Sequence, residues 1–163
     1  DPDLAIFTSR SDRNLNRLIN IWNNHIYPKY KKGKLLITPT NNIKEENSIS
    51  FRKMNTKELL IKDLLRSRIF LIPGHKAELY CLAAEEAREL CIPIVTLGIG
   101  SLSERVIHNN TGFIAKNDQE FSNYTIELFK NNDLWNKLRS NLISLRGSKK
   151  WDLSTKKFLD SIK

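Results

Sequence analysis

The sequence predicts an α/β fold, a Rossmann-like parallel sheet with helices on both faces. Short apolar runs alternate with longer segments whose apolar residues recur at helical spacing, which is typical of parallel strands joined by helices. Two of the runs, 68–73 and 92–97, are almost uninterrupted, as expected for strands buried on both faces. The chain has 163 residues and shows no internal repeat or linker, so we expect one domain over 1–163.

The first elements are expected in the order strand, helix, strand. Residues 4–9 form a short apolar run followed by polar residues, which predicts a strand. Apolar residues then recur at helical spacing over 15–26, and Asp12 can cap this helix while Pro28 limits it. A second apolar run predicts a strand at 34–39.

A third strand, a helix and a buried strand are expected next. After a polar loop, the segment 48–54 predicts the strand. Asn55 or Thr56 then begins a helix through residue 67, because the leucines that follow recur at helical spacing. The run 68–73 predicts the fourth strand.

The rest of the chain continues the alternation. A helix expected from about residue 79 to 90 leads into a strand at 92–97, and a turn precedes a short strand at 112–116. Amphipathic segments predict helices over 118–146 and 152–162. Strands and helices in this order predict a parallel sheet that is covered on both sides.

The formal net charge of +9 leaves three classes of anionic partner open: nucleic acids, nucleotides and anionic membranes. The basic residues are scattered with acidic ones between them, which is typical of solvated surface. The chain also lacks a recognition-helix motif and aromatic residues interleaved with lysines. We therefore expect no nucleic-acid partner and keep a nucleic-acid-binding domain as a distant alternative.

Several features concern the compartment. No apolar stretch is long enough to span a membrane, and the start of the chain does not resemble a signal peptide. Cys81 and Cys91 lie ten residues apart with no further ligand at metal-binding spacing, so we expect neither a metal site nor a disulfide. We expect a cytoplasmic protein, whose positive surface can rest on the inner face of the membrane. Because the first residue is Asp1, we expect a fragment of a longer protein.

Ligands of such sheets bind at the carboxyl ends of the strands, where helix N-termini present free N–H groups to phosphates. Three loops lie there: 8–14, 51–56 and 73–81. In the last one, Glu78 is expected just before a helix and Glu86 about two turns inside it. A rise of about 12 Å would let one carboxylate reach a sugar and the other reach the ribose of the same nucleotide-sugar. The spacing alone is more often that of a helix-start acid and an exposed surface acid.

A longer pattern carries a family resemblance. Residues 78–117, ELYCLAAEEARELCIPIVTLGIGSLSERVIHNNTGFIAKN, contain in order a Glu, an aromatic residue, an apolar helix, Glu-Ala, a Pro-ended turn, a strand, a Gly loop, Glu-Arg and Thr-Gly-Phe. This pattern resembles the C-terminal, donor-binding domain of the retaining GT-B glycosyltransferases of family 4, also called glycosyl transferases group 1. The resemblance implies that the acceptor is bound by an N-terminal domain outside this chain.

The resemblance also implies roles around the helix start. Glu86 would bind the ribose hydroxyls, and Glu78 would contact a hydroxyl of the transferred sugar. Carboxylates suit both tasks because each accepts two hydrogen bonds from neighbouring hydroxyls. Tyr80, Cys81 and Leu82 would supply backbone N–H groups to the donor. The family commonly has Gly where Cys81 stands, which leaves the choice of sugar open.

The two other loops have implied roles as well. The segment SRSDRN resembles the basic diphosphate clamp of the family, with Arg13 as first and Arg10 as second candidate for the phosphates. A guanidinium can bind phosphate through two parallel bonds and stabilise the charge of the leaving nucleoside diphosphate. Lys53 and Met54 lie where the family cradles the base. The donor would be UDP- or GDP-linked, and no cofactor or metal ion is needed.

Other residues have competing interpretations. His75 in the third loop is expected to tether the loop rather than act as a base. Glu104 resembles a family acid beside the Gly loop and is equally explained as a surface acid. Trp22, Trp135 and Trp151 are expected in the core. The function that the resemblance implies is hexosyl transfer with retention, and the alternative is a degenerate module that binds a nucleotide or sugar without catalysis.

Overall fold

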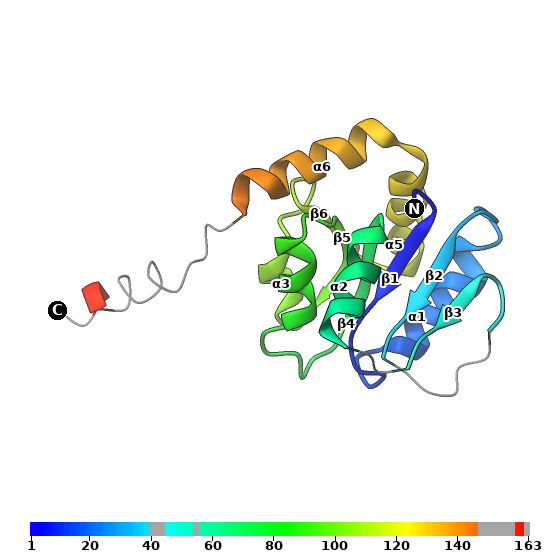
Figure 1. Cartoon of the computed structure of the whole chain (residues 1–163), viewed down its shortest axis with the longest axis horizontal. Coiled ribbons are helices and arrows are strands. Elements are labelled where there is room, and N and C mark those ends of the chain that lie inside the picture. The colour runs from blue at the N-terminus through cyan, green and yellow to red at the C-terminus, as the bar shows by residue number, and fades with distance from the viewer. Residues whose placement is uncertain (40–44, 54–55, 147–158, 162–163) are drawn as a thin grey trace.

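The computed structural model describes residues 1–39, 45–53, 56–146 and 159–161 of the chain. One six-stranded sheet runs through it in the order β3-β2-β1-β4-β5-β6, and every neighbouring pair is parallel (Figure 1). The strands are β1 (Leu4–Phe7), β2 (Lys34–Ile37), β3 (Ile49–Phe51), β4 (Ile69–Gly74), β5 (Ile94–Ile99) and β6 (Gly112–Ile114). The predicted α/β class with a parallel sheet is confirmed.

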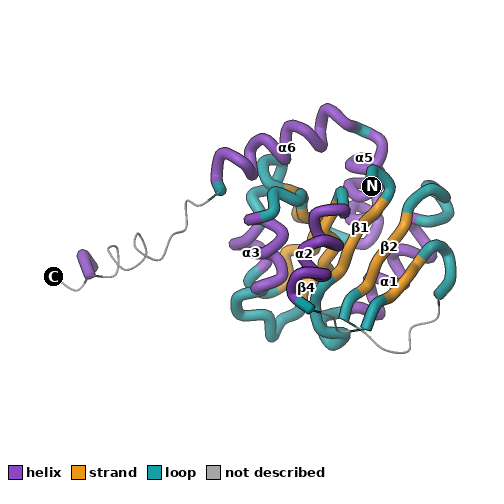
Figure 2. Tube along the Cα trace, viewed as in Figure 1, coloured by secondary structure: helices purple, strands orange, loops and turns teal. Residues whose placement is uncertain are grey.

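Helices cover both faces of this sheet. They are α1 (Leu15–Ile21) with its π-helical continuation η1 (Trp22–Ile26), α2 (Lys57–Arg66), α3 (Leu82–Glu89), the short α4 (Leu102–Arg105), α5 (Asp118–Lys130) and α6 (Asn132–Leu145). Figure 2 shows α2 and α3 on one face and α1 with α5 on the other. None of the helices in the described residues combines the length and the apolar character needed to cross a membrane.

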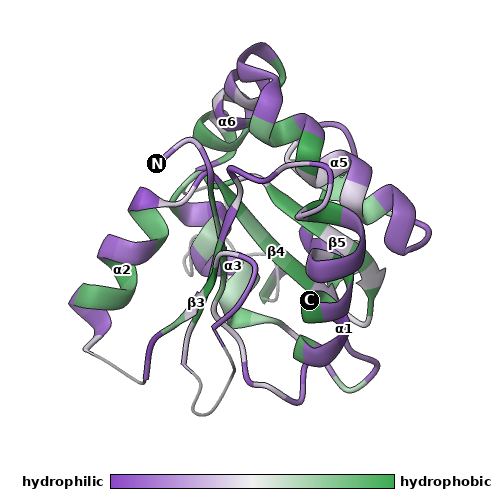
Figure 3. Ribbon diagram, turned by 90° about the vertical axis from the view of Figure 1, so that its right-hand side faces the viewer, coloured by the Kyte–Doolittle hydropathy of each residue, from purple (hydrophilic) through white to green (hydrophobic). Residues whose placement is uncertain are grey.

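The centre of the sheet is the core of the molecule. β1 and β4 are buried at every position, and for β4 the uninterrupted apolar run at 68–73 predicted this burial. Figure 3 shows apolar strands lying between helices whose outer faces are polar. Trp22 is fully buried, and its indole N–H donates to the carbonyl of Asn47 at 2.9 Å. Trp135 is partly buried against the same core, while Trp151 lies outside the described residues.

Two helix starts differ from the prediction. Asp12 does not cap the first helix, because its carboxylate accepts hydrogen bonds from Arg10 and Arg13. The N-cap is Asn14 in the left-handed conformation, and its side chain donates to the carbonyl of Gly74. The third helix begins at Leu82 rather than near residue 79, so the rise calculated for eight helical residues does not apply between Glu78 and Glu86.

The end of the chain contains one more expected helix. The segment 152–162 lies mostly outside the described residues, and 159–161 form a helical turn. α6 lies across the amino ends of the strands, where the Trp135 indole N–H donates to the carbonyl of Arg68 at 2.8 Å. The opposite, carboxyl ends of the strands carry the predicted loops.

Candidate functional site

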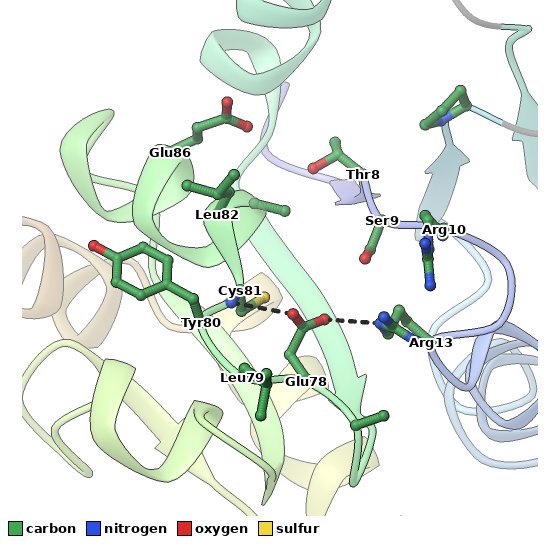
Figure 4. Close-up of a pocket in the computed structure, with 13 residues that line it drawn as sticks. Thr8, Ser9, Arg10, Arg13, Glu78, Leu79, Tyr80, Cys81, Leu82 and Glu86 are labelled. Atoms are coloured by element: carbon green, nitrogen blue, oxygen red, sulfur yellow. Dashed lines mark hydrogen bonds and ion pairs between the residues drawn. The ribbon is translucent and has the colours of Figure 1, made fainter.

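A pocket of about 570 Å³ lies at the carboxyl ends of β1 and β4, where the sequence predicted a ligand site (Figure 4). We call it the carboxyl-edge pocket. It is lined by Thr8, Ser9, Arg10, Arg13, Pro39, residues 77–83 and Glu86. The loop after β1 and the segment between β4 and α3 therefore face each other across one cavity.

An ion pair between these two segments crosses the pocket. Arg13 Nε donates to Glu78 Oε2 at 3.1 Å, and the two side chains are only 16% and 15% exposed. Arg13 Nη1 also contacts Asp12 at 3.2 Å. The candidate phosphate ligand and the candidate sugar ligand thus lie side by side and neutralise each other. A ligand with an anionic part and a hydroxyl part could use both groups at once.

The loop that carries Glu78 is fixed by close backbone contacts. Gly100 has φ +70°, and a Cβ there would collide with the carbonyl oxygen of His75 and lie 2.9 Å from that of Glu78. The N–H of Glu78 donates to the His75 carbonyl at 2.9 Å, and the N–H of Ser101 donates to the Glu78 carbonyl at 2.9 Å. The His75 ring accepts the N–H of Ala77 at 3.1 Å, so this histidine tethers the loop as expected.

Cys81 shapes the transition from this loop into α3. It is the N-cap residue, with φ 59° in the left-handed region, and it is 3% exposed. Burial raises the pKa of its thiol to about 11, so the side chain is a neutral packed group at physiological pH. Its backbone N–H, expected to face a donor, donates to Glu78 Oε1 at 3.1 Å. The carboxylate of Glu78 is thereby held on both oxygens.

The start of α3 presents free backbone donors to the pocket. The Cys81 carbonyl accepts the N–H groups of Ala84 and Glu85, and no acceptor among the described residues takes those of Leu82 and Ala83. Both residues line the carboxyl-edge pocket. Unpaired N–H groups and the helix dipole attract anions, so this side of the cavity has positive potential.

Glu86 differs from Glu78 in every contact. It lies in the second turn of α3 and is exposed, and its carboxylate forms no hydrogen bond or ion pair with the described residues. Figure 4 shows its carboxylate on the upper wall, apart from the Arg13–Glu78 pair. Glu86 also lines a second groove of about 190 Å³ between α2 and α3. Its oxygens are therefore available to a ligand without breaking an existing contact.

Sequence reasoning missed one polar side chain in the pocket. The hydroxyl of Thr8 is buried and has no hydrogen-bond partner among the described residues. Such an unpaired buried hydroxyl is uncommon, and here it lines the cavity beside Ser9. The signal in the sequence was positional, since Thr8 and Ser9 directly follow the first apolar run.

The remaining candidates lie at the rim or outside. Arg10 lines the pocket, but its side chain is 70% exposed and is paired with Asp12 at 2.7 Å. Lys53 is exposed and does not line the cavity, while Met54 lies outside the described residues. Glu104 is exposed in α4, away from the lining.

Tyr80 lines the pocket from the α3 side. Its ring stacks under the Arg105 guanidinium at 4.1 Å, which holds it beside the helix start. Among the described residues there is no cluster of three or more His, Cys, Asp or Glu side chains that could hold a metal ion. The positive groups of the cavity are thus its arginines and its helix N–H groups.

A comparison with protein families finds one match. The family model described as "Glycosyl transferases group 1" matches residues 28–144, which is more than half of the chain. A search of curated protein sequences finds no match.

Solved structures share the fold at low sequence identity. The chain is similar to the C-terminal domain of the glycosyl transferase group 1 family protein LpcC from Francisella tularensis, with a TM-score of 0.70, 17% identity, and coverage of 90% of this chain and 84% of that one. It is also similar to a TarM mutant of S. aureus in complex with fondaparinux, α-GlcNAc-glycerol and UDP, with a TM-score of 0.80, 16% identity, and coverage of 97% and 35%. A third similar structure is HepE from Anabaena in complex with UDP and glucose, with a TM-score of 0.78, 14% identity, and coverage of 98% and 47%. The chain thus spans less than half of the latter two proteins.

Proposed function

This chain belongs to the glycosyl transferases group 1 family, and we propose that its carboxyl-edge pocket binds the nucleotide-diphosphate-sugar donor of a hexosyl transfer. The observation that carries the proposal is the convergence, on one cavity, of Arg13, two free helix N–H groups and two carboxylates. Such a set matches a ligand that is anionic in its middle and rich in hydroxyls at both ends. HepE and the TarM mutant, which have the same fold, are described in complex with UDP.

The diphosphate is the part of the donor that the positive side of the cavity would hold. The N–H groups of Leu82 and Ala83 would bind one phosphate at the start of α3. Arg13 would bind the other with its guanidinium, and Arg10 at the rim would add a second, solvent-exposed charge. In the transition state, charge grows on the leaving nucleoside diphosphate, and these groups would stabilise it.

The two carboxylates would hold the sugars on either side of the diphosphate. Glu86, with no contact to give up, would accept hydrogen bonds from the ribose hydroxyls. Glu78 would accept one from a hydroxyl of the transferred hexose while it keeps the Cys81 N–H. Because Glu78 is fixed on both oxygens before the donor arrives, little orientational freedom is lost on binding. Lys53 and Met54 would lie toward the base.

Transfer also requires an acceptor, and we propose that an N-terminal domain outside this chain binds it. The other wall of the reaction cleft would come from that domain, and the reaction would proceed with retention at the anomeric carbon. We therefore expect this chain alone to bind the donor and to transfer essentially nothing. A cytoplasmic location, with the positive surface against the inner face of an anionic membrane, fits a glycolipid or polysaccharide acceptor.

Calorimetric titration of the chain with UDP, GDP and their sugar conjugates tests the proposal. We expect one nucleotide to bind selectively and Glu86→Ala to weaken its binding about tenfold, as for the loss of hydrogen bonds to a charged group. Glu104→Ala, which removes an exposed acid outside the pocket, is the matched control and should leave the affinity unchanged. A wild-type chain that binds neither nucleotide would contradict the proposal and favour a module that has lost the donor role.

A further inference from the structure

A second cavity, of about 340 Å³, lies at the amino ends of β1 and β4, opposite the carboxyl-edge pocket. Its lining brings together three arginines from separate elements: Arg66 at the end of α2, Arg68 just before β4, and Arg139 on α6. Trp135 of α6 stands among them. We call this cavity the arginine pocket. It is independent of the donor proposal, since it shares no lining residue with the other cavity.

Arg68 is the most unusual of the three. It is only 7% exposed, and its guanidinium donates to two neutral acceptors, the Leu128 carbonyl and Asn132 Oδ1, each at 2.7 Å. It forms no ion pair with a carboxylate in the described part of the chain. Burial lowers the pKa of Arg68, and the charge of Asp3 only partly opposes this, because Asp3 is not paired with Arg68 and accepts a hydrogen bond from Tyr30 instead. Buried charges are normally paired, so this cation lacks the counter-charge that burial calls for.

Of the other two arginines, Arg139 forms no ion pair with the described residues and Arg66 forms only a long one. Arg139 donates to the Cys91 carbonyl at 3.3 Å, and its guanidinium lies 5.3 Å from the Trp135 ring centroid. Arg66 is 64% exposed, and its nearest carboxylate, that of Asp63, lies 3.9 Å away. Asp63 is closer to Arg52, at 3.1 Å, so that carboxylate is already shared.

One acid does line the cavity, and it is neutralised. The Asp1 carboxylate pairs with Lys34 at 3.0 Å. Three arginines therefore line a cavity whose described lining supplies no free negative charge of its own. An arginine has five donors in a planar fork that matches the oxygens of a phosphate.

A packing role explains part of this arrangement. Arg68 and Arg139 both stack on the Trp135 ring, at 4.9 and 5.3 Å, and the indole N–H donates to the Arg68 carbonyl. These contacts hold α6 against the sheet. They do not account for Arg66, whose side chain forms no hydrogen bond with α6 among the described residues. They also do not account for the cavity that the three arginines line.

We propose that the arginine pocket is a binding site for a phosphate-type anion, a phosphate monoester or a diphosphate. The same chemistry is offered by a soluble phosphate compound and by the head group of an anionic phospholipid. Either would supply the counter-charge for Arg68 and accept bidentate hydrogen bonds from Arg66 and Arg139. The site is remote from the carboxyl-edge pocket, so both can be occupied together.

The Trp135 indole N–H provides a local reporter for the test. Its cross-peak in a nitrogen-proton correlation spectrum is assigned by Trp135→Phe, and the full chain is titrated with inorganic pyrophosphate at constant ionic strength. We expect a saturable shift of this peak. Arg66→Gln and Arg139→Gln should each raise the dissociation constant about tenfold, as for the loss of one charge-assisted hydrogen bond. Because Arg66 is mostly exposed, its substitution leaves the fold intact even if Arg139→Gln loosens α6.

Lys137→Gln is the matched control, since it removes one charge from the exposed face of the same helix outside the pocket. It should change the dissociation constant by less than about twofold. Sedimentation with phosphatidylglycerol and phosphatidylcholine vesicles separates the two sources. Binding to the anionic vesicles that depends on Arg66, without a response to pyrophosphate, supports a lipid head group. No response to either probe, or equal effects of Arg66→Gln and Lys137→Gln, would overturn the proposal.

Discussion

The two ends of the sheet carry arginines in contrasting surroundings. At the carboxyl ends, Arg13 is met by the carboxylates of Glu78 and Asp12. At the amino ends, the Arg68 guanidinium contacts only neutral groups among the residues that the structure describes, namely a backbone carbonyl, an amide oxygen and an indole ring. The first environment is mixed in charge and suits a ligand with both phosphate and hydroxyl groups. The second has three arginines and one acid that is already paired with Lys34, so it suits an anion. The partner of each buried arginine is therefore more informative about function than the net charge of the chain.

Among the substitutions that test this contrast, we expect the largest loss of stability and of nucleotide binding at Gly100. A methyl group there collides with the His75 carbonyl in a backbone conformation that L-residues rarely adopt, so the loop carrying Glu78 must move. We expect Gly100→Ala to lower the free energy of unfolding by about 3 kcal/mol and to abolish nucleotide binding. Gly33→Ala, whose Cβ would meet Tyr30 atoms at 3.2 Å without a positive φ, should cost about 1 kcal/mol or less. Urea denaturation measures the free energy of unfolding of both variants. Equal losses in Gly100→Ala and Gly33→Ala would refute the special role of the Gly100 contact.

A second effect concerns pH at the carboxyl end. Burial raises the pKa of the Cys81 thiol to about 11 from an ordinary value of 9.0, so the folded chain holds this proton more tightly than the unfolded chain. The stability that the neutral thiol contributes is complete below pH 9 and is lost as the pH rises toward 11. Between about pH 8 and about pH 10.5 we expect the wild type to lose about 1 to 2 kcal/mol more than Cys81→Ser. Parallel pH profiles for the two proteins would argue against a buried, protonated thiol.

A third and smaller effect separates the two kinds of arginine contact. A double-mutant cycle on Arg13 and Glu78 should give a coupling of about 1 kcal/mol, because the pair is well formed and mostly shielded from solvent. The same cycle on Arg66 and Asp63 should give a coupling near zero, because the atoms lie 3.9 Å apart and Arg66 is exposed. Equal coupling energies in the two cycles would show that the arginine contacts at the two ends of the sheet do not differ in strength.

The sequence was sufficient for the fold because its signals are local. Apolar runs and helical spacing placed all six strands of the described sheet, and Pro28 limited the first helix as expected. The start of α3 was placed too early because it depends on Cys81 adopting a left-handed conformation, which is unfavourable for a residue other than glycine. The helix cap at Asp12 was wrong because two arginines compete for that carboxylate.

The site could be predicted only in part. Glu78 and Arg13 were each placed on loops at the carboxyl edge, but their mutual ion pair is a tertiary contact between residues 65 positions apart. The hydrogen bond from the Cys81 N–H to Glu78 is local, spanning three residues, and it was missed because this N–H was expected to face the donor. The arginine pocket left no signal in the sequence, because Arg139 on α6 lies far along the chain from Arg66 and Arg68 and joins them only in the folded structure.

The most direct test of the donor site is to map where a nucleoside diphosphate binds on this chain. Backbone amide shifts are followed during titration with the nucleotide that calorimetry selects. We expect changes at Thr8, Leu82 and Ala83, around the carboxyl-edge pocket, that saturate at a lower nucleotide concentration than any change at the Trp135 indole. Shifts centred on Trp135 with none at Leu82 and Ala83 would place the nucleotide at the amino ends of the strands and contradict the donor site proposed for this chain.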